Sequence, residues 1–436
     1  MSLSLDKKPS LNIAIYTLDF QWAGGIDLLH GLVKGLLTQE KRRCSVFILV
    51  HDPSVPAIKS IYRKLTDVAR TAVELSRNPS TIKSISPFKK DIQVNNDDYQ
   101  QINNIKEIFS KEDVEIIYYN DYGYEGKLNA LQSIKADVVL PVLLNGFPPS
   151  CPVPWVGYLF DFVYKYYTHL YTKEFCLRTD INYATTLLNA KSVIVNSKAT
   201  HDDLNKFIPY AKSEIYNLPF APYTNESIYN VAVAESDILE KYKIVHPYFV
   251  ISNQFWLHKS HETAFEALRI LRNEQGNHIE IVCTGRMTDL SGTDERKKQL
   301  LQHVENLGLT NAIHFLGHIP KTDQLALMLR SVAVLQPTLF EGGPGGGAVY
   351  MAVANGIPAI ISDIEVNKEI QNESLVTFFK ASDANDLAIK MGEALTVQRE
   401  IVMYEILRLN NKERLTQLGD TLIDCIDFTM QSYSKN

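Results

Sequence analysis

The chain has 436 residues, of which 45% are hydrophobic and 22% are charged, and its formal net charge is −6. This composition is typical of a globular protein, and the length exceeds what one ordinary core accommodates, so we expect two domains of roughly 200 residues each. No long run of Lys and Arg concentrates positive charge, which argues against nucleic acid as a partner.

The cysteines and the N-terminus bear on the cellular compartment. Five cysteines are dispersed without a CxxC pair, which argues against a disulfide framework and against a Cys-based metal site. The first residues show no long apolar stretch followed by a small-residue cleavage site, and the most apolar region, residues 138–160, contains five prolines. We therefore expect a cytoplasmic protein.

Short apolar runs alternate with amphipathic segments along the whole chain, a pattern typical of βαβ units and a parallel sheet. Residues 218–225 contain two prolines and no periodicity, which indicates a linker, and the polar stretch 76–98 is expected to be a mobile loop. The expected strands fall into two sets, 12–17, 45–50, 114–119, 138–143, 156–160 and 192–196, then 248–252, 278–284, 312–315, 332–336, 359–362 and 376–379.

These two sets predict an α/β protein with two Rossmann-like domains and a deep inter-domain cleft. We expect the domains at 1–220 and 221–412, followed by a C-terminal helix, 413–436, that packs back on the N-terminal domain. Open α/β sheets bind ligands beyond the carboxyl ends of their strands, so the functional residues should follow the strands.

The strongest functional signal follows the expected strand 332–336. Glu341 is followed by five glycines among residues 342–347, and a helix starts near Ala348. Glycines allow backbone N–H groups to converge on an anion, and the N-terminus of a helix adds partial positive charge. We predict that this loop binds a diphosphate and that Glu341 accepts hydrogen bonds from sugar hydroxyls.

The segment from Glu341 to Asp363 contains Ala352-x-Ala354-x-Gly356-x-Pro358 and resembles the signature of the retaining glycosyltransferases of family four, which have the GT-B fold. The resemblance implies transfer of a sugar from a nucleotide-diphosphate sugar, with no cofactor beyond that co-substrate and no metal. Met351 stands where the family has a second acidic residue that binds ribose, so no ribose contact is expected from it.

Further motifs extend the resemblance over most of the chain. Lys259 matches the second residue of a basic pair that clamps the donor diphosphate, and Gln254 stands at the first position. Asp161 matches the second residue of a His-Asp pair in which Phe160 replaces the histidine. The resemblance implies catalytic roles for Lys259, Glu341 and Asp161. Gly24 and Gly25 are expected to form a turn before a helix. The resemblance implies donor contacts from Gly24, Gly25, Gln254, Lys259, Gly285, Arg286, Gly317, His318, Ile319, Gly345, Gly346, Gly347 and Ala348.

Several interpretations stay open at this stage. The replacements at Met351, Phe160 and Gln254 also suit a non-catalytic partner subunit, and a GT-B nucleotide-sugar epimerase is a third alternative. A nicotinamide dehydrogenase is disfavoured because no GxGxxG follows the first expected strand. The expected acceptor is a saccharide or lipid-linked saccharide in bacterial surface polysaccharide synthesis, with peripheral contact at the inner face of the membrane. His258 and His261 are expected to be structural residues rather than metal ligands.

Overall fold

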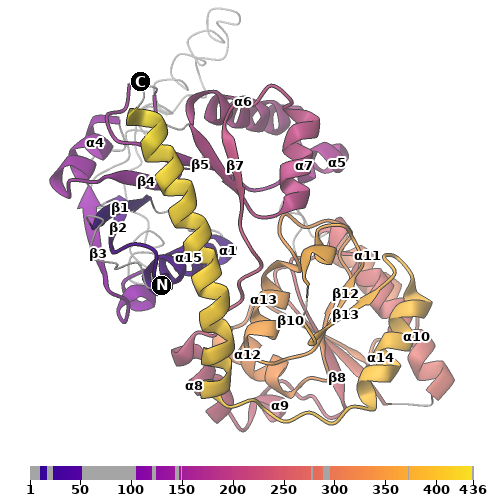
Figure 1. Ribbon diagram of the computed structural model, residues 1–436. Coiled ribbons are helices and arrows are strands. Elements are labelled where there is room, and N and C mark those ends of the chain that lie inside the picture. Colours follow the sequence, from indigo (N-terminus) through magenta and orange to yellow (C-terminus); the bar gives the residue numbers. More distant parts are fainter. Residues whose placement is uncertain are drawn as a thin grey trace, which may run out of the picture.

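A computed structural model gives the structure of the protein. It describes residues 10–16, 23–51, 105–119, 124–142, 147–148, 150–275, 278–287, 295–371 and 373–434. The loop expected at 76–98 lies outside these residues. Figure 1 shows two lobes, each built around a parallel sheet, and a long C-terminal helix that runs along both.

The N-terminal lobe contains a sheet of seven parallel strands among the described residues, in the order β3-β2-β1-β4-β5-β6-β7. Three of its inner strands, β4, β5 and β6, are buried along their whole length, as expected for a parallel sheet covered by helices on both faces. The strands are β1 (Leu11–Tyr16), β2 (Cys44–His51), β3 (Val114–Tyr119), β4 (Val138–Val142), β5 (Trp155–Leu159), β6 (Ser192–Val195) and β7 (Glu214–Asn217).

The helices of this lobe alternate with its strands. They are α1 (Ala23–Thr38), α4 (Tyr124–Ser133), α5 (Val163–Tyr166), the 3₁₀ turn η3 (Thr168–Leu170), α6 (Lys173–Asn189) and α7 (Lys198–Phe207), and residues 105–109 form one further helical turn. Leu29, Leu32 and Leu36 of α1 lie in the core of the lobe because their spacing places them on one face of the helix.

The C-terminal lobe repeats the architecture with the sheet order β10-β9-β8-β11-β12-β13. Its strands are β8 (Tyr248–Ser252), β9 (Glu280–Thr284), β10 (Ile313–Gly317), β11 (Val334–Gln336), β12 (Ala359–Ser362) and β13 (Val376–Phe379). The helical segments are α8 (Glu226–Ala234), α9 (Ile238–Lys241), η4 (Leu257–Lys259), α10 (His261–Gln275), α11 (Glu295–Asn306), α12 (Lys321–Arg330), α13 (Gly346–Ala354), η5 (Asn367–Glu369) and α14 (Ala384–Leu395).

In both sheets the strand order reverses direction at a switch point. This point lies between β1 and β4 in the first sheet and between β8 and β11 in the second. At this point the loops after the two neighbouring strands run to opposite faces of the sheet. The space between these loops can hold a ligand. The prediction of two Rossmann-like units in an α/β protein is confirmed by this topology.

The helix α15 (Tyr404–Ser434) connects the two lobes. Leu407, near its start, belongs to the core of the C-terminal lobe, whereas Leu418 and Leu422 belong to the core of the N-terminal lobe. It crosses α1 at two glycines, where a Cβ on Gly419 would lie 2.6 Å from the carbonyl carbon of Gly35. The helix begins at Tyr404, ahead of residue 413, because the preceding turns also find apolar partners.

Most expected strands agree with the structure to within two residues. The strand β7 has no counterpart among the expected strands. It is a short edge strand with one exposed and three half-buried residues, and its sequence EIYN has no apolar alternation. Its backbone pairs with β6 along its full length, so the neighbouring strand rather than local preference specifies it.

Candidate functional site

The glycine loop follows β11 at the switch point of the C-terminal sheet. Gly345 and Gly346 have φ values of 68° and 64°, a left-handed conformation that favours glycine. Gly345 is the N-cap of α13 and supplies no side-chain cap, which leaves the first amides of the helix available to an anion. The helix begins at Gly346, so Gly347 and Ala348 lie in its first turn.

The side chain of Glu341 lies directly beneath this helix start. A Cβ on Gly346 would approach the Glu341 carboxylate to 3.1 Å, so glycine permits the acidic group to sit here. The ammonium of Lys259, at the end of η4, donates to Glu341 Oε1 at 2.5 Å, and the two side chains are 11% and 10% exposed. Gln336 Nε2 donates to the same oxygen at 2.8 Å.

Two side-chain amides hold this carboxylate in place. Asn253, directly after β8, donates from Nδ2 to Gln336 Oε1 at 2.5 Å, and Gln336 in turn holds Glu341. Gln336 is fully buried at the end of β11. The site therefore joins the ends of β8 and β11, the two strands that flank the switch point, and both of its charged groups have buried partners.

Asp161 approaches the same loop from the N-terminal lobe. It follows β5, and a Cβ on Gly342 would lie 2.8 Å from the Asp161 Cβ. Asp161 Oδ1 accepts a hydrogen bond from the Val163 backbone N–H at 2.9 Å. Burial, together with the negative charge of Glu341, raises the pKa of Asp161 to about 6, against the opposing effects of the Val163 N–H and the Lys259 ammonium. The structure thus brings together Asp161, Glu341 and Lys259.

The ends of β9 and β10 lie beside the end of β8, at the same edge of the sheet. Gly285 has φ of 127°, and a Cβ there would lie 2.7 Å from the carbonyl carbon of Asn253, so only glycine permits this approach. Its N–H donates to Gly317 O at 2.8 Å. Arg286 and His318 are exposed beside these turns, Ile319 packs against the core, and Gln254 is half-buried.

The Gly24-Gly25 pair occupies a different local structure from the one expected. The sequence suggested a turn before a helix, but both glycines lie in the first turn of α1, since the helix begins at Ala23. The residues between Tyr16 and Ala23 lie outside the described structure. One turn further along α1, Asp27 forms an ion pair with Lys321 at the start of α12, so this helix end contacts the C-terminal lobe.

The two histidines near Lys259 are packed into the core. His258 is 3% exposed and His261 is fully buried, and His261 stacks on Phe255 with 4.3 Å between the ring centroids. Burial lowers the pKa of each imidazole to about 3, so both are neutral at physiological pH. In the part of the chain that the structure describes, no three or more His, Cys, Asp or Glu side chains gather to hold a metal ion.

The replaced family positions serve packing. Met351 is half-buried against the core of the C-terminal lobe, and its carbonyl oxygen accepts from Asn355 Nδ2 at 2.7 Å. Phe160 packs edge-on against Tyr158 with centroids 5.0 Å apart. Phe160 has no side-chain acceptor, and the Met351 thioether is only a weak one.

Sequence reasoning missed the polar residues that support the site. Gln336 hydrogen-bonds to both Asn253 and Glu341, and Asn367 bonds to both Gly345 and Ser362. Thr200 bonds to Gly342 across the two lobes. Gln336 stands at the end of an apolar strand, which is the one sequence signal that could have revealed it. The others lie in ordinary loop and helix-start positions.

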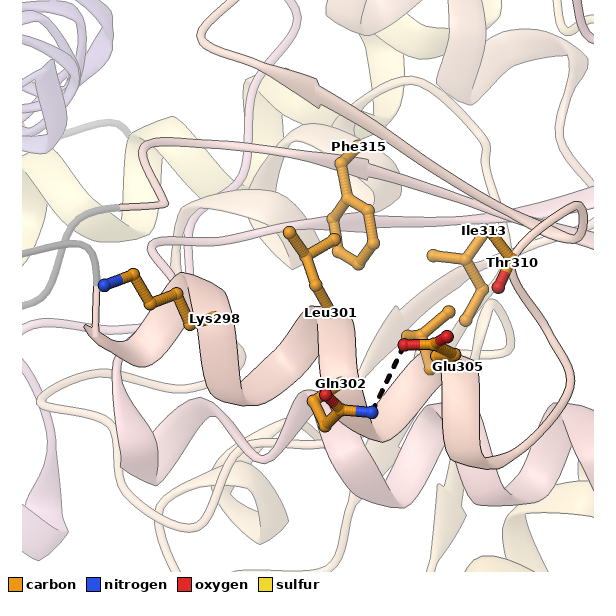
Figure 2. A pocket seen from close by; sticks show the side chains of 8 residues that line it. Lys298, Leu301, Gln302, Glu305, Thr310, Ile313 and Phe315 are labelled. Atoms are coloured by element: carbon orange, nitrogen blue, oxygen red, sulfur yellow. Dashed lines mark hydrogen bonds between the residues drawn. The ribbon is translucent and has the colours of Figure 1, made fainter.

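A pocket elsewhere in the C-terminal lobe shares no residue with this site. It lies between α11 and the edge strand β10, where Leu301, Ile313 and Phe315 form an apolar floor with Gln302 and Glu305 at its rim (Figure 2). Gln302 and Glu305 hydrogen-bond to each other at 3.2 Å. Its lining includes neither the glycine loop nor the ion pair between Lys259 and Glu341.

The comparisons with known proteins address the fold and the family. Residues 238–413 match the model of the family described as glycosyl transferases group 1. No curated protein sequence matches the chain. No helix among the described residues has the length and apolar character needed to cross a membrane.

Solved structures resemble the chain over nearly its whole length. Sucrose-phosphate synthase from Thermosynechococcus elongatus has a TM-score of 0.54 at 14% identity. The alignment covers 98% of this chain and 100% of the synthase chain. HepE from Anabaena, solved with UDP-glucose, also has a TM-score of 0.54 at 14% identity, and the alignment covers 98% of this chain and 100% of HepE. A UDP-forming α,α-trehalose-phosphate synthase from Burkholderia xenovorans has a TM-score of 0.53 at 13% identity, with coverage of 96% and 99%.

At these identities the solved structures establish the fold, and the family match covers the lobe that carries the glycine loop and Lys259. The resemblance drawn from the motifs is confirmed at this level. The chain has the GT-B fold, and its residues 238–413 match the model of the glycosyl transferases group 1.

Proposed function

We propose that this chain is a retaining glycosyltransferase that moves a sugar from a nucleoside-diphosphate sugar to a saccharide or lipid-linked saccharide. The proposal is carried by one observation, the meeting of Lys259, Glu341 and Asp161 beside the uncapped start of α13. The site combines a cation and free backbone amides, which suit a diphosphate, with carboxylates, which suit sugar hydroxyls.

The donor diphosphate would lie against the amides that follow Gly345, within reach of the Lys259 ammonium. The positive charge of Lys259 is compensated by Glu341. A bound diphosphate shares this cation and develops more negative charge as the bond to the sugar breaks. Stabilisation that grows toward the transition state accelerates the reaction.

Glu341 and Asp161 would orient the sugar from opposite lobes. The Glu341 carboxylate is fixed by Gln336 and Lys259, so it can accept sugar hydroxyls without reorganisation. Asp161, with its pKa at about 6, is largely ionised at neutral pH and can accept a hydroxyl of the sugar or of the acceptor. Transfer thus requires both lobes to be in place.

For the chemical step we propose attack on the anomeric carbon from the face that the diphosphate leaves. The acceptor oxygen forms its bond to that carbon as the carbon–phosphate oxygen bond breaks, and the leaving phosphate oxygen takes the hydroxyl proton. This scheme retains the anomeric configuration and needs no protein nucleophile and no metal. The solved relatives named with UDP or UDP-glucose support the choice of a nucleotide sugar as donor.

A donor panel tests the proposal. Purified protein is incubated with UDP-, GDP-, dTDP- and ADP-sugars, with and without saccharide acceptors and with or without EDTA. We expect nucleoside diphosphate release, an acceptor product that keeps the donor's anomeric configuration in NMR spectra, and no effect of EDTA. Isomerised donor without an acceptor would indicate an epimerase, and donor binding without any turnover would indicate a non-catalytic subunit.

Surface polysaccharide synthesis at the inner face of the membrane is the cellular role we propose for this activity. It depends on the acceptor, so it is tested with lipid-linked and water-soluble saccharides in parallel. A strong preference for soluble acceptors would contradict this part of the proposal.

A further inference from the structure

The start of α7, in the N-terminal lobe, contacts the glycine loop of the C-terminal lobe. Thr200 Oγ1 donates to the carbonyl oxygen of Gly342 at 2.8 Å. Ser197 Oγ, the N-cap of α7, lies 3.0 Å from the same carbonyl oxygen and 3.0 Å from Thr200 Oγ1. Ser197 is fully buried and Thr200 is 3% exposed, so water does not compete for these bonds.

A carboxylate of the C-terminal lobe caps the same helix. Glu369, at the end of η5, accepts from the backbone N–H of Lys198 at 2.8 Å and of Ala199 at 2.7 Å. These are two of the amides that an α-helix leaves unsatisfied at its N-terminus, where a negative charge is favoured. The start of α7 therefore both gives hydrogen bonds to the opposite lobe and receives a charged cap from it.

The same η5 segment fixes the far end of the glycine loop. Asn367, two residues before Glu369, accepts from the Gly345 N–H at 2.8 Å and donates to Ser362 O at 2.8 Å. Asn367 is fully buried. The loop is thus held at Gly345 by its own lobe and at Gly342 by the other lobe, with Glu341 immediately before the second attachment.

We infer that Glu369, Ser197 and Thr200 are positioning residues that form an interdomain clamp and hold the glycine loop against Asp161 for sugar transfer. The inference rests on the proposed function. When the lobes separate, the bonds to Gly342 and Glu369 must break, whereas the bond between Asn367 and Gly345 lies within one lobe and persists. The clamp makes the position of the loop at Gly342 depend on contact between the two lobes.

This arrangement separates nucleotide binding from turnover. The groups that would bind the diphosphate, Lys259 and the α13 amides, belong to the C-terminal lobe and do not need the clamp. Asp161 contacts the loop at Gly342, which is the residue that the clamp holds. Loss of the clamp should therefore lower kcat far more than it weakens binding of a nucleoside diphosphate.

The experiment uses the full chain and two pairs of variants. Glu369→Gln removes the charge and one of the two acceptor oxygens, and Glu365→Gln is its control because Glu365 is an exposed acid of the same loop paired with Lys368. Thr200→Val removes the hydroxyl at nearly constant volume, and Thr200→Ser retains it. We measure kcat and KM for the donor, the Kd of the nucleoside diphosphate, and hydrogen exchange of the peptide that covers the start of α7.

Glu369→Gln and Thr200→Val should lower kcat about tenfold, the usual effect of one well-formed buried or charged hydrogen bond on a rate. The Kd should stay within about twofold, because the diphosphate ligands are untouched. Exchange at the start of α7 should be faster in Glu369→Gln, and both control variants should behave as the wild type.

Unchanged kcat in Glu369→Gln and Thr200→Val, or a Kd that weakens as much as kcat falls, overturns the inference. Hydrogen exchange needs no substrate, so it remains decisive if the wild type transfers no sugar and the proposed function fails. In that case equal exchange at α7 in Glu369→Gln and Glu365→Gln overturns the clamp, and faster exchange in Glu369→Gln supports it.

Discussion

Replacing Asp161 by Asn tests the electrostatic description of the site. Asn keeps an oxygen that accepts from the Val163 N–H but carries no charge. In the wild type, burial raises the pKa of Asp161 from 3.8 to about 6. Ionisation of this carboxyl in the folded protein therefore costs up to about 3 kcal/mol relative to the unfolded chain.

The sign of the pH dependence follows from the raised pKa. Below about pH 4 the carboxyl is protonated in both the folded and the unfolded state, so it does not lower the free energy of unfolding. Between pH 4 and about 6 the unfolded chain has lost the proton while the folded protein retains it, so the wild type loses stability relative to Asp161→Asn as pH rises. Above about 6 both states are ionised and the difference stays constant.

The assay is the midpoint of thermal unfolding of wild type and Asp161→Asn at pH 4, 5, 6, 7 and 8. We expect the unfolding midpoint of Asp161→Asn to rise relative to that of the wild type as the pH increases to about 6. In a domain of this size, each kcal/mol of stability difference shifts the midpoint by about 2–4 °C. Turnover should fall in the same variant because the oriented carboxylate is lost. A stability difference that does not change with pH would refute the buried, raised-pKa carboxyl.

Three further substitutions probe other parts of the structure. Gly419→Ala places a methyl group 2.6 Å from the carbonyl carbon of Gly35 where α15 crosses α1, and it should lower the free energy of unfolding by about 3 kcal/mol in a denaturation experiment. Gly285→Ala adds strain at φ of 127° and a contact of 2.7 Å to Asn253, and should weaken both stability and nucleotide binding. Lys259→Ala should lower turnover on the order of a hundredfold, measured under donor saturation.

Gly347→Ala is the matched control for the two glycine substitutions, since a Cβ there would meet nothing within 4 Å. Its unfolding midpoint should equal or exceed that of the wild type because Ala favours the helix. Wild-type stability of Gly419→Ala would contradict the close packing of α15 on α1, and wild-type turnover of Lys259→Ala would remove this lysine from the mechanism.

The sequence predicted correctly those strands whose apolar local pattern matches their burial in the structure. The strands at 248–252, 359–362 and 376–379 coincide with β8, β12 and β13, since each is a short apolar run between clear breaks. The meeting of Glu341 and Lys259 was also foreseeable, because parallel strands place the loops after β8 and β11 at the same edge.

The polar side-chain contacts between the two lobes could not be predicted from the sequence. Glu369 caps α7 at Lys198, 171 residues away, and no propensity or periodicity encodes such a pair. The first turn of α1 was missed for another reason, because glycine disfavours helix interiors and Gly24-Gly25 therefore suggested a turn. There, tertiary packing of α1 outweighs the local preference.

The proposed function depends on a diphosphate that binds between the amides after Gly345 and the ammonium of Lys259. Calorimetric titration of the protein with UDP, GDP, dTDP and ADP tests it most directly, with Lys259→Ala and the surface control Lys198→Ala alongside. We predict that at least one nucleotide binds wild type and Lys198→Ala equally, and binds Lys259→Ala at least about tenfold more weakly. Failure of all four to bind, or equal binding to Lys259→Ala, would contradict the claim.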